Sequence, residues 1–208
     1  MSAVEAALFD IGNVLIHWDP RHLFRRIFRT PDGAPDEERV EWFLGTICTT
    51  PWHVRHDLGR SPEAQTSELI ARHPAYRAEI EAFYGRFQDM IPGPLESIVA
   101  AKQSMRASGI RVYGLTNFGA ETFRETRERF GFLQEFDGVV VSGEERMIKP
   151  DPRIFELCIA RFALDPERTL FIDDSAPNIK AADALGFRTH HFRCEETCLD
   201  AFRNLALI

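Results

Sequence analysis

Five short apolar segments alternate along the chain with longer segments in which apolar residues recur every three or four positions. The short segments are rich in β-branched or aromatic residues and are bounded by turn-forming residues, so we predict strands at 6–9, 110–115, 138–141, 169–172 and 188–192. Segments such as 95–105 and 154–162 have the spacing of amphipathic helices. This alternation predicts an α/β fold, a doubly wound parallel five-stranded sheet with helices on both faces.

Residues 19–92 interrupt the alternation. They carry helical patterns broken by Pro and Gly turn signals, and they contain no convincing strand. The segment 91–94, Ile-Pro-Gly-Pro, is stiff and rich in turn residues, which suits a hinge. We therefore expect two domains, a core of residues 1–18 and 93–208 and a helical domain of residues 19–92 inserted after the first strand.

The composition is that of an ordinary globular protein. With 208 residues and 44% hydrophobic content the chain can bury a sizeable core. The formal net charge of -7 argues against a general affinity for nucleic acid or for anionic membranes, since both recruit clustered Lys and Arg. No apolar stretch is long enough to span a bilayer, and Glu5 lies where a signal peptide would be basic or apolar. We therefore expect a cytoplasmic protein that binds neither nucleic acid nor membrane.

The four cysteines are too few and too scattered for a disulfide framework, so we interpret them as reduced thiols. One alternative is a zinc site made by the last group of His and Cys residues. Its candidate ligands are His190, His191, Cys194 and Cys198. Their spacing fits no standard zinc motif, which makes zinc the weaker hypothesis.

Polar residues follow four of the predicted strands. They are Asp10 after the first, Thr116 and Asn117 after the second, Lys149 shortly after the third, and Asp173 and Asp174 after the fourth. The carboxyl ends of parallel strands meet at one edge of the sheet, where open α/β sheets carry out chemistry. The adjacent carboxylates of Asp173 and Asp174 would repel each other unless a cation lies between them. A hard divalent ion with oxygen ligands, Mg²⁺ above all, would relieve that repulsion together with Asp10.

Four segments, taken in order, resemble the motifs of the haloacid dehalogenase-like (HAD) hydrolase superfamily. They are 9–14 (Phe-Asp-Ile-Gly-Asn-Val), 115–117 (Leu-Thr-Asn), 147–152 (Met-Ile-Lys-Pro-Asp-Pro) and 171–178 (Phe-Ile-Asp-Asp-Ser-Ala-Pro-Asn). Each motif is weak alone, but the order, the spacing and the helical insertion after the first make the resemblance specific. It extends over nearly the whole chain and implies a Rossmann-like core with a small helical cap.

The resemblance also implies roles for individual residues. Asp10 would be the nucleophile that forms a covalent aspartyl intermediate, Thr116 would bind an oxygen of the transferred group, and Lys149 would pair with Asp10 and with that group. The implied metal ligands are Asp10, the backbone carbonyl of Gly12, Asp174 and, directly or through water, Asp173. The expected substrate- and phosphate-binding residues are Gly12, Asn13, His17, Trp52, Thr116, Asn117 and Lys149. Asn178 is either an orienting residue beside the metal ligands or a polar residue at the start of a helix.

Gly12 departs from the superfamily pattern. Most phosphatases of this kind have an aspartate at that position, which serves as the general acid for the leaving alcohol. Without it, the enzyme should favour better leaving groups such as sugar 1-phosphates and acyl phosphates. The Asp-x-Gly-Asn-Val form of the motif is also similar to that of the sugar-1-phosphate phosphatase branch. A replacement acid could come from His17 or Asp19.

The insertion resembles the small helical cap that closes over the active site and selects substrates in this superfamily. Its candidate substrate-facing residues are Trp18, Trp42, Trp52, His53, Arg55, His56 and Asp57, of which we expect most to pack inside the cap, Trp42 in particular. The resulting prediction is a Mg²⁺-dependent phosphatase for small phosphorylated metabolites, sugar phosphates first, acting as a monomer or homodimer.

Two other functions stay open at the level of sequence. A 2-haloacid dehalogenase would use the same aspartate to displace halide without a metal, although the pair Asp173 and Asp174 would hinder binding of a carboxylate substrate. A catalytically weak binding protein could have kept the fold and lost activity through Gly12. Against that, Asp10, Thr116, Lys149 and Asp174 are all present, and a decayed site has no chemical reason to keep them together.

Overall fold

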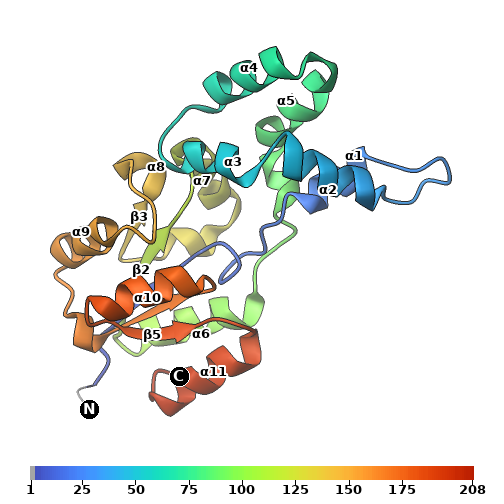
Figure 1. Cartoon of the computed structure of the whole chain (residues 1–208). Helices are drawn as coiled ribbons and strands as arrows, with labels where there is room; N and C mark the ends of the chain where they lie inside the picture. The colour runs from blue at the N-terminus through green and yellow to red at the C-terminus, as the bar shows by residue number, and fades with distance from the viewer. Residues whose placement is uncertain (1–2) are drawn as a thin grey trace.

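The computed structural model describes residues 3–208 and contains a central sheet of five parallel strands (Figure 1). The strands are β1 (Ala6–Phe9), β2 (Arg111–Thr116), β3 (Gly138–Val141), β4 (Thr169–Asp173) and β5 (Arg188–His191), and their order in the sheet is β3-β2-β1-β4-β5. Each strand expected from the sequence is present, with ends that differ by one residue at most. The predicted α/β fold is confirmed.

Strand β1 lies in the middle of the sheet and is completely buried. Its side chains alternate between the two faces, as strand geometry requires. Phe9 packs in one apolar cluster with Ile98 and Phe202, whereas Leu8 packs in another with Phe155. A strand covered on both faces must be apolar throughout, which explains the run Ala-Ala-Leu-Phe before the first acidic residue.

Helices of the core cover both faces of the sheet (Figure 1). They are α6 (Glu96–Ala107), α7 (Ala120–Arg129), α8 (Ser142–Glu145), α9 (Pro152–Phe162), α10 (Ala176–Ala184) and α11 (Glu195–Asn204), with the short 3-10 helices η3 (Gly131–Gln134) and η4 (Pro166–Arg168). Buried side chains of α6, α7 and α11 belong to the cluster that contains Phe9, and those of α9 and α10 to the cluster that contains Leu8.

A second group of helices lies between β1 and α6 in the chain and occupies the top of Figure 1. It comprises α1 (Arg21–Ile27), α2 (Glu37–Thr46), α3 (Thr50–Asp57), α4 (Pro62–Arg72), η1 (Pro74–Tyr76), α5 (Arg77–Gly85) and η2 (Phe87–Met90). Asp36, Thr49 and Ser61 accept backbone N–H groups at the starts of α2, α3 and α4, so the turn residues of the sequence act as helix caps. We call this group the inserted helices.

Two passages of the chain join the inserted helices to the core and run side by side. The backbone N–H of His17 donates to the Gly93 carbonyl at 3.0 Å, and that of Asp19 donates to the Met90 carbonyl at 3.1 Å. The apolar cluster around Phe9 continues into the inserted helices without a break. The expected boundaries at 18/19 and 92/93 fall within this connection, and the division into two domains stays a prediction.

Two smaller observations complete the fold. The cysteines are free thiols, of which Cys194 is exposed and Cys48, Cys158 and Cys198 are buried. Across residues 3–208, every helix is too short or too polar to cross a membrane.

Candidate active site

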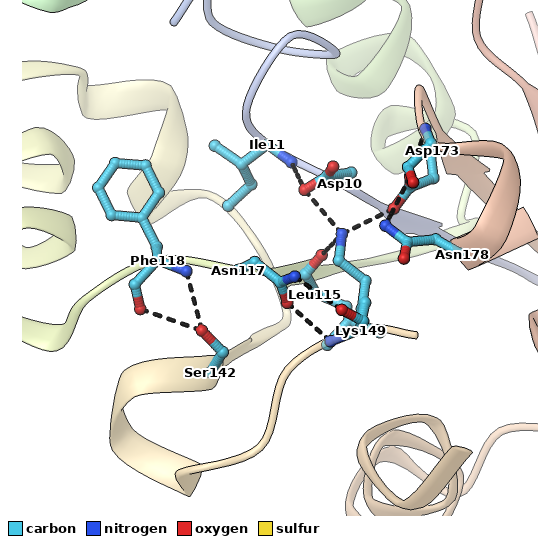
Figure 2. A network of polar contacts seen from close by, with 10 residues as sticks. Asp10, Ile11, Leu115, Asn117, Phe118, Ser142, Lys149, Asp173 and Asn178 are labelled. Carbon is cyan, nitrogen blue, oxygen red and sulfur yellow. Dashed lines mark hydrogen bonds and ion pairs between the residues drawn. The ribbon is translucent and has the colours of Figure 1, made fainter. Parts of the chain in front are cut away.

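Asp10 lies directly after β1, at the carboxyl edge of the sheet. Its backbone N–H donates to the Ile172 carbonyl at 2.8 Å, which fixes it beside the end of β4. Its Oδ1 atom accepts the Ile11 N–H at 2.7 Å, and the residue is only 8% exposed (Figure 2). Burial raises the pKa of the Asp10 carboxyl to about 7, although Lys149 opposes that rise and the nearby Asp173 adds to it.

Lys149 connects three strands through one ammonium group. Its Nζ atom lies 2.9 Å from Oδ1 of Asp10 and 2.7 Å from Oδ2 of Asp173, and it donates to the Leu115 carbonyl at 2.9 Å (Figure 2). These contacts occupy all three donors of the ammonium. Burial lowers the pKa of Lys149, but the two carboxylates outweigh it, and the pKa is raised. A charged lysine is therefore held between the ends of β1 and β4.

Asn117 holds the backbone of Lys149 in place. Its Nδ2 atom donates to the Lys149 carbonyl at 2.9 Å, and its Oδ1 atom accepts the Lys149 N–H at 2.8 Å. This reciprocal pair joins the loop after β2 to the segment before α9 (Figure 2). Asn117, expected to bind phosphate, therefore uses its side-chain amide to position the lysine.

Asp173 and Asp174 have different surroundings although they are adjacent. Asp173 is fully buried, and its Oδ1 atom accepts the Ser175 N–H at 2.8 Å and the Asn178 amide at 2.9 Å. Asp174 is exposed as a residue, but partial desolvation of its carboxyl and the charge of Asp173 raise its pKa. Asn178 thus fixes the orientation of Asp173, the first of the two roles that the sequence left open.

The three carboxylates form a group that can hold a metal ion. One oxygen from each of Asp10, Asp173 and Asp174 lies within 4.8 Å of the others. Three carboxylates face the single ammonium of Lys149, so a divalent cation with hard oxygen ligands would balance the remaining negative charge. In the described part of the chain this is the only such group, so the zinc site considered at His190, His191, Cys194 and Cys198 does not form.

Thr116 and Gly12 lie at the same edge of the sheet as these carboxylates. Thr116 is the last residue of β2, the neighbour of β1, and is 1% exposed. Gly12 follows Asp10 in the loop after β1, and a Cβ atom added to it would meet no heavy atom within 4 Å. Glycine is therefore not required by space at position 12, since a Cβ atom would fit there.

A cavity of about 420 Å³ opens between this site and the inserted helices. The core contributes Gly12, Asn117 and Phe118 to its wall. Most of the remaining lining is apolar and comes from Trp18, Pro20, Leu44, Cys48, Val54, Phe83 and Phe87. The polar groups that line it are Arg21, Glu41, Thr50, His53 and Asp57.

Three of the predicted substrate-facing residues, Trp18, His53 and Asp57, reach this cavity. The rings of Trp18 and His53 stack with centroids 5.3 Å apart. Burial lowers the pKa of His53 to about 3, so the imidazole is neutral. The Nε1 atom of Trp18 is buried without a hydrogen-bond partner, and so is Oδ1 of Asp57.

Other predicted cap residues pack elsewhere. Trp52, expected to bind substrate, is 5% exposed, and its ring contacts Phe83 edge-to-face at 5.0 Å. The ring nitrogens of His56 lie 2.9 Å from the Arg60 carbonyl and 3.0 Å from the Thr122 hydroxyl. These contacts leave Trp52 packed within the inserted helices and place His56 where they meet α7.

Three more candidates lie outside the cavity lining. Asn13 is exposed, has a left-handed backbone with φ of 55°, and accepts the Trp18 N–H at 2.9 Å, so it closes a turn. His17 is exposed and is not brought to the cavity. The expectation that Trp42 is packed inside the cap was wrong, because its side chain is 44% exposed and contacts Tyr76 at the surface.

Sequence reasoning missed the aromatic residues that form much of the cavity wall. Phe118 directly follows Asn117, so the second motif already contained a signal for it. Phe83 and Phe87 come from α5 and η2, where helical spacing marks them as buried without indicating a cavity.

Comparison with known proteins identifies the class. Residues 4–186 match the family described as haloacid dehalogenase-like hydrolase, and this chain belongs to that family of hydrolases. The family resemblance carried by the four motifs is therefore confirmed.

Relatives of similar length support the same class. A sesquiterpene phosphatase of Aspergillus oryzae, astK, is 27% identical over 198 residues, which is 94% of each chain. A phosphorylated carbohydrates phosphatase of Thermotoga maritima is 23% identical and aligns over 88% of this chain and 82% of its own length. The chain spans only 17% and 33% of two longer curated relatives that it also matches.

A solved structure has the same fold. An HAD family enzyme from Bacteroides thetaiotaomicron superimposes with a TM-score of 0.75 and 22% identity, over 97% of this chain and all of that chain. The same enzyme in complex with magnesium and inorganic phosphate gives a TM-score of 0.68 at 22% identity, over 92% of this chain and 95% of that one.

Proposed function

We propose that this protein is a Mg²⁺-dependent phosphatase that hydrolyses small phosphorylated metabolites through an aspartyl-phosphate on Asp10. The observation that carries the proposal is the buried Asp10 carboxylate 2.9 Å from Lys149, beside two further carboxylates. The relatives named as phosphatases support the same reaction class. We also propose that residues 19–92 act as a cap over the site.

In the proposed first step Asp10 attacks phosphorus, and the bond from phosphorus to the leaving oxygen breaks. A phosphate dianion approaches a carboxylate only where positive charge neutralises both, and Lys149 supplies part of that charge beside Asp10. Thr116, at the end of the neighbouring strand, is proposed to bind one phosphate oxygen. Asn117 keeps Lys149 in position, and Asn178 does the same for Asp173.

The residues present fit Mg²⁺. Asp10, Asp173, Asp174 and the carbonyl of Gly12 would hold it, and when bound it would supply the remaining positive charge for a transferred phosphoryl group. The relative from Bacteroides thetaiotaomicron, solved with magnesium and inorganic phosphate, supports this assignment.

The residues that line the cavity indicate which class of substrate would bind. The sequence favoured sugar phosphates, and the relative from Thermotoga maritima is named for phosphorylated carbohydrates. The wall of the cavity is nevertheless mainly apolar, with Trp18, Phe83, Phe87 and Phe118 around it. Such a wall binds an apolar organic group better than a sugar, whose hydroxyls would lose hydrogen bonds to water. We therefore place monophosphates of apolar alcohols beside sugar phosphates as candidate substrates.

A screen of phosphate release tests the proposal. The purified protein should release inorganic phosphate from members of a panel of sugar 1-phosphates, sugar 6-phosphates, acyl phosphates, nucleotides and alkyl phosphates, and EDTA should abolish the release. The 2-haloacids serve as the control for dehalogenation: release of fluoride or chloride from them without metal would favour a haloacid dehalogenase. If neither phosphate nor halide is released, with or without Mg²⁺, the result would favour the hypothesis of a binding protein.

A further inference from the structure

The proposed reaction needs a proton donor for the leaving alcohol, and position 12 has no side chain to supply one. Two carboxyl groups of the inserted helices line the cavity, those of Glu41 and Asp57. Glu41 is paired with Arg21, whose Nη2 atom donates to Oε2 at 2.8 Å. That hydrogen bond lowers the pKa of Glu41 and keeps it ionised. Asp57 has no such partner.

The carboxyl of Asp57 lies at the end of α3, at the cavity, and the residue is 7% exposed. Its Oδ1 atom is buried without a hydrogen-bond partner. The nearest cationic candidate, Nε2 of His53, lies 3.8 Å away, which is too long for a hydrogen bond. An ionised carboxylate without a partner is costly in such a place, whereas a protonated one can donate to a ligand in the cavity.

Backbone contacts hold Asp57 against the catalytic loops. Its carbonyl accepts the Ser142 hydroxyl at 2.7 Å, and the oxygen of that hydroxyl accepts the Phe118 N–H at 2.9 Å. Phe118 follows Asn117, which positions Lys149. The bonds of Ser142 and Phe118 lie beside the Asn117–Lys149 pair in Figure 2. Asp57 is thereby fixed relative to the phosphate site although it belongs to the inserted helices.

We propose that Asp57 is the proton donor and acceptor of the proposed phosphatase, in place of the carboxyl group that Gly12 lacks. In the first step the electron pair of the broken phosphorus–oxygen bond goes to the leaving oxygen, which takes the Asp57 proton and departs as the alcohol. In the second step water attacks phosphorus from the position that the alcohol left, and Asp57 takes a proton from that water. The bond from phosphorus to Asp10 then breaks, which releases phosphate and restores both carboxyl groups. This inference rests on the proposed function.

Among the titratable groups around it in the cavity, Asp57 is the one suited to exchange a proton near neutral pH. His53 lies 3.8 Å from its carboxyl, and Tyr84 of α5 interacts with it electrostatically. Cys48 and the Arg21–Glu41 pair line the same cavity, and the neighbouring His56 of α3 contacts the Arg60 carbonyl and the Thr122 hydroxyl. Burial lowers the pKa of both histidines and raises that of Cys48 and Tyr84, so none of these four changes charge near pH 7. Burial raises the pKa of Asp57 itself to about 7, which suits a general acid.

A comparison of two leaving groups tests the proposal. Hexyl phosphate needs a proton on its leaving oxygen, whereas p-nitrophenyl phosphate leaves as a stable anion. In Asp57→Asn, kcat/KM for hexyl phosphate should fall by roughly 10²–10⁴-fold, and that for p-nitrophenyl phosphate by less than about tenfold. The matched control is Asp32→Asn, on an exposed loop of the inserted helices, which should change neither value. Turnover of hexyl phosphate by the wild type should decline as pH rises above about 7, and the variant should lose that decline.

A rescue experiment separates chemistry from folding. Gly12→Asp, introduced into the Asp57→Asn variant, places a carboxyl group in open space beside the site and should restore hexyl phosphate turnover. Equal losses for both esters in Asp57→Asn, or a wild type that cleaves only p-nitrophenyl phosphate, would overturn the role of Asp57. A wild type that cleaves neither ester with Mg²⁺ would instead refute the proposed phosphatase.

Discussion

At the scale of single residues, Lys149 is the cation shared by two buried carboxylates. Its side chain is 1% exposed, and its ammonium contacts Asp10 and Asp173, which are themselves almost fully buried. A buried ion pair contributes little net stability, but removal of one partner leaves an uncompensated charge in the interior. We therefore expect the lysine to offset the negative charge of this buried cluster as well as to serve the proposed phosphate site.

Lys149→Met tests this role. The substitution keeps an unbranched apolar side chain and leaves Asp10 and Asp173 without their ammonium, so the free energy of unfolding should fall by about 3–5 kcal/mol near neutral pH. Urea denaturation measures the change, with exposed Lys180→Met as the control. Unchanged stability in Lys149→Met would mean that the ammonium does not compensate buried negative charge in the folded protein.

At the scale of elements, the sequence predicted the core better than the inserted helices. Each predicted strand must pair within the sheet, and turn residues mark where it ends. The sequence alone therefore placed an acid after a buried strand, such as Asp10 or Asp173, at the carboxyl edge of the sheet. The side-chain direction that brings Asn178 onto Asp173 was left open, because it depends on the start of α10.

The sequence could not predict which side chains of the inserted helices line the cavity, for a physical reason. Helical spacing identifies a buried face but not which neighbour covers it, and Trp18 lies before the first helix, so the sequence could not distinguish the surroundings of Trp52 from those of Trp18. Trp52 packs on Phe83 within the inserted helices, whereas Trp18 lines the cavity. The cavity wall also joins residues far apart in the chain, such as Trp18 and Phe118, whose proximity exists only in the folded molecule.

At the scale of the whole molecule, a rise in pH that ionises Asp10 and the binding of Mg²⁺ should have opposite effects on stability. The pKa of Asp10 is raised from 3.8 to about 7, so between these values the folded state binds more protons than the unfolded state. The contribution of Asp10 to stability without metal should therefore fall as pH rises through this window. Mg²⁺ binds the ionised carboxylates and competes with protons, so its stabilising effect should grow as pH rises.

Thermal unfolding at two pH values checks this expectation. At matched ionic strength, Mg²⁺ should raise the Tm more at pH 8 than at pH 6, and Asp174→Asn should reduce the increase at both values. A Tm increase that is independent of pH, or one that Asp174→Asn leaves intact, would indicate that the ion binds elsewhere.

The covalent intermediate on Asp10 is the central claim, and intact-mass spectrometry of acid-quenched enzyme during turnover tests it most directly. In the presence of Mg²⁺ and a substrate that the screen identifies, the wild-type protein should gain the mass of one phosphoryl group, mapped by peptide analysis to Asp10. Asp10→Asn should fold normally, gain no such mass and lose turnover. A phosphoryl group on another residue, or an Asp10→Asn variant that turns over at the wild-type rate, would contradict the account.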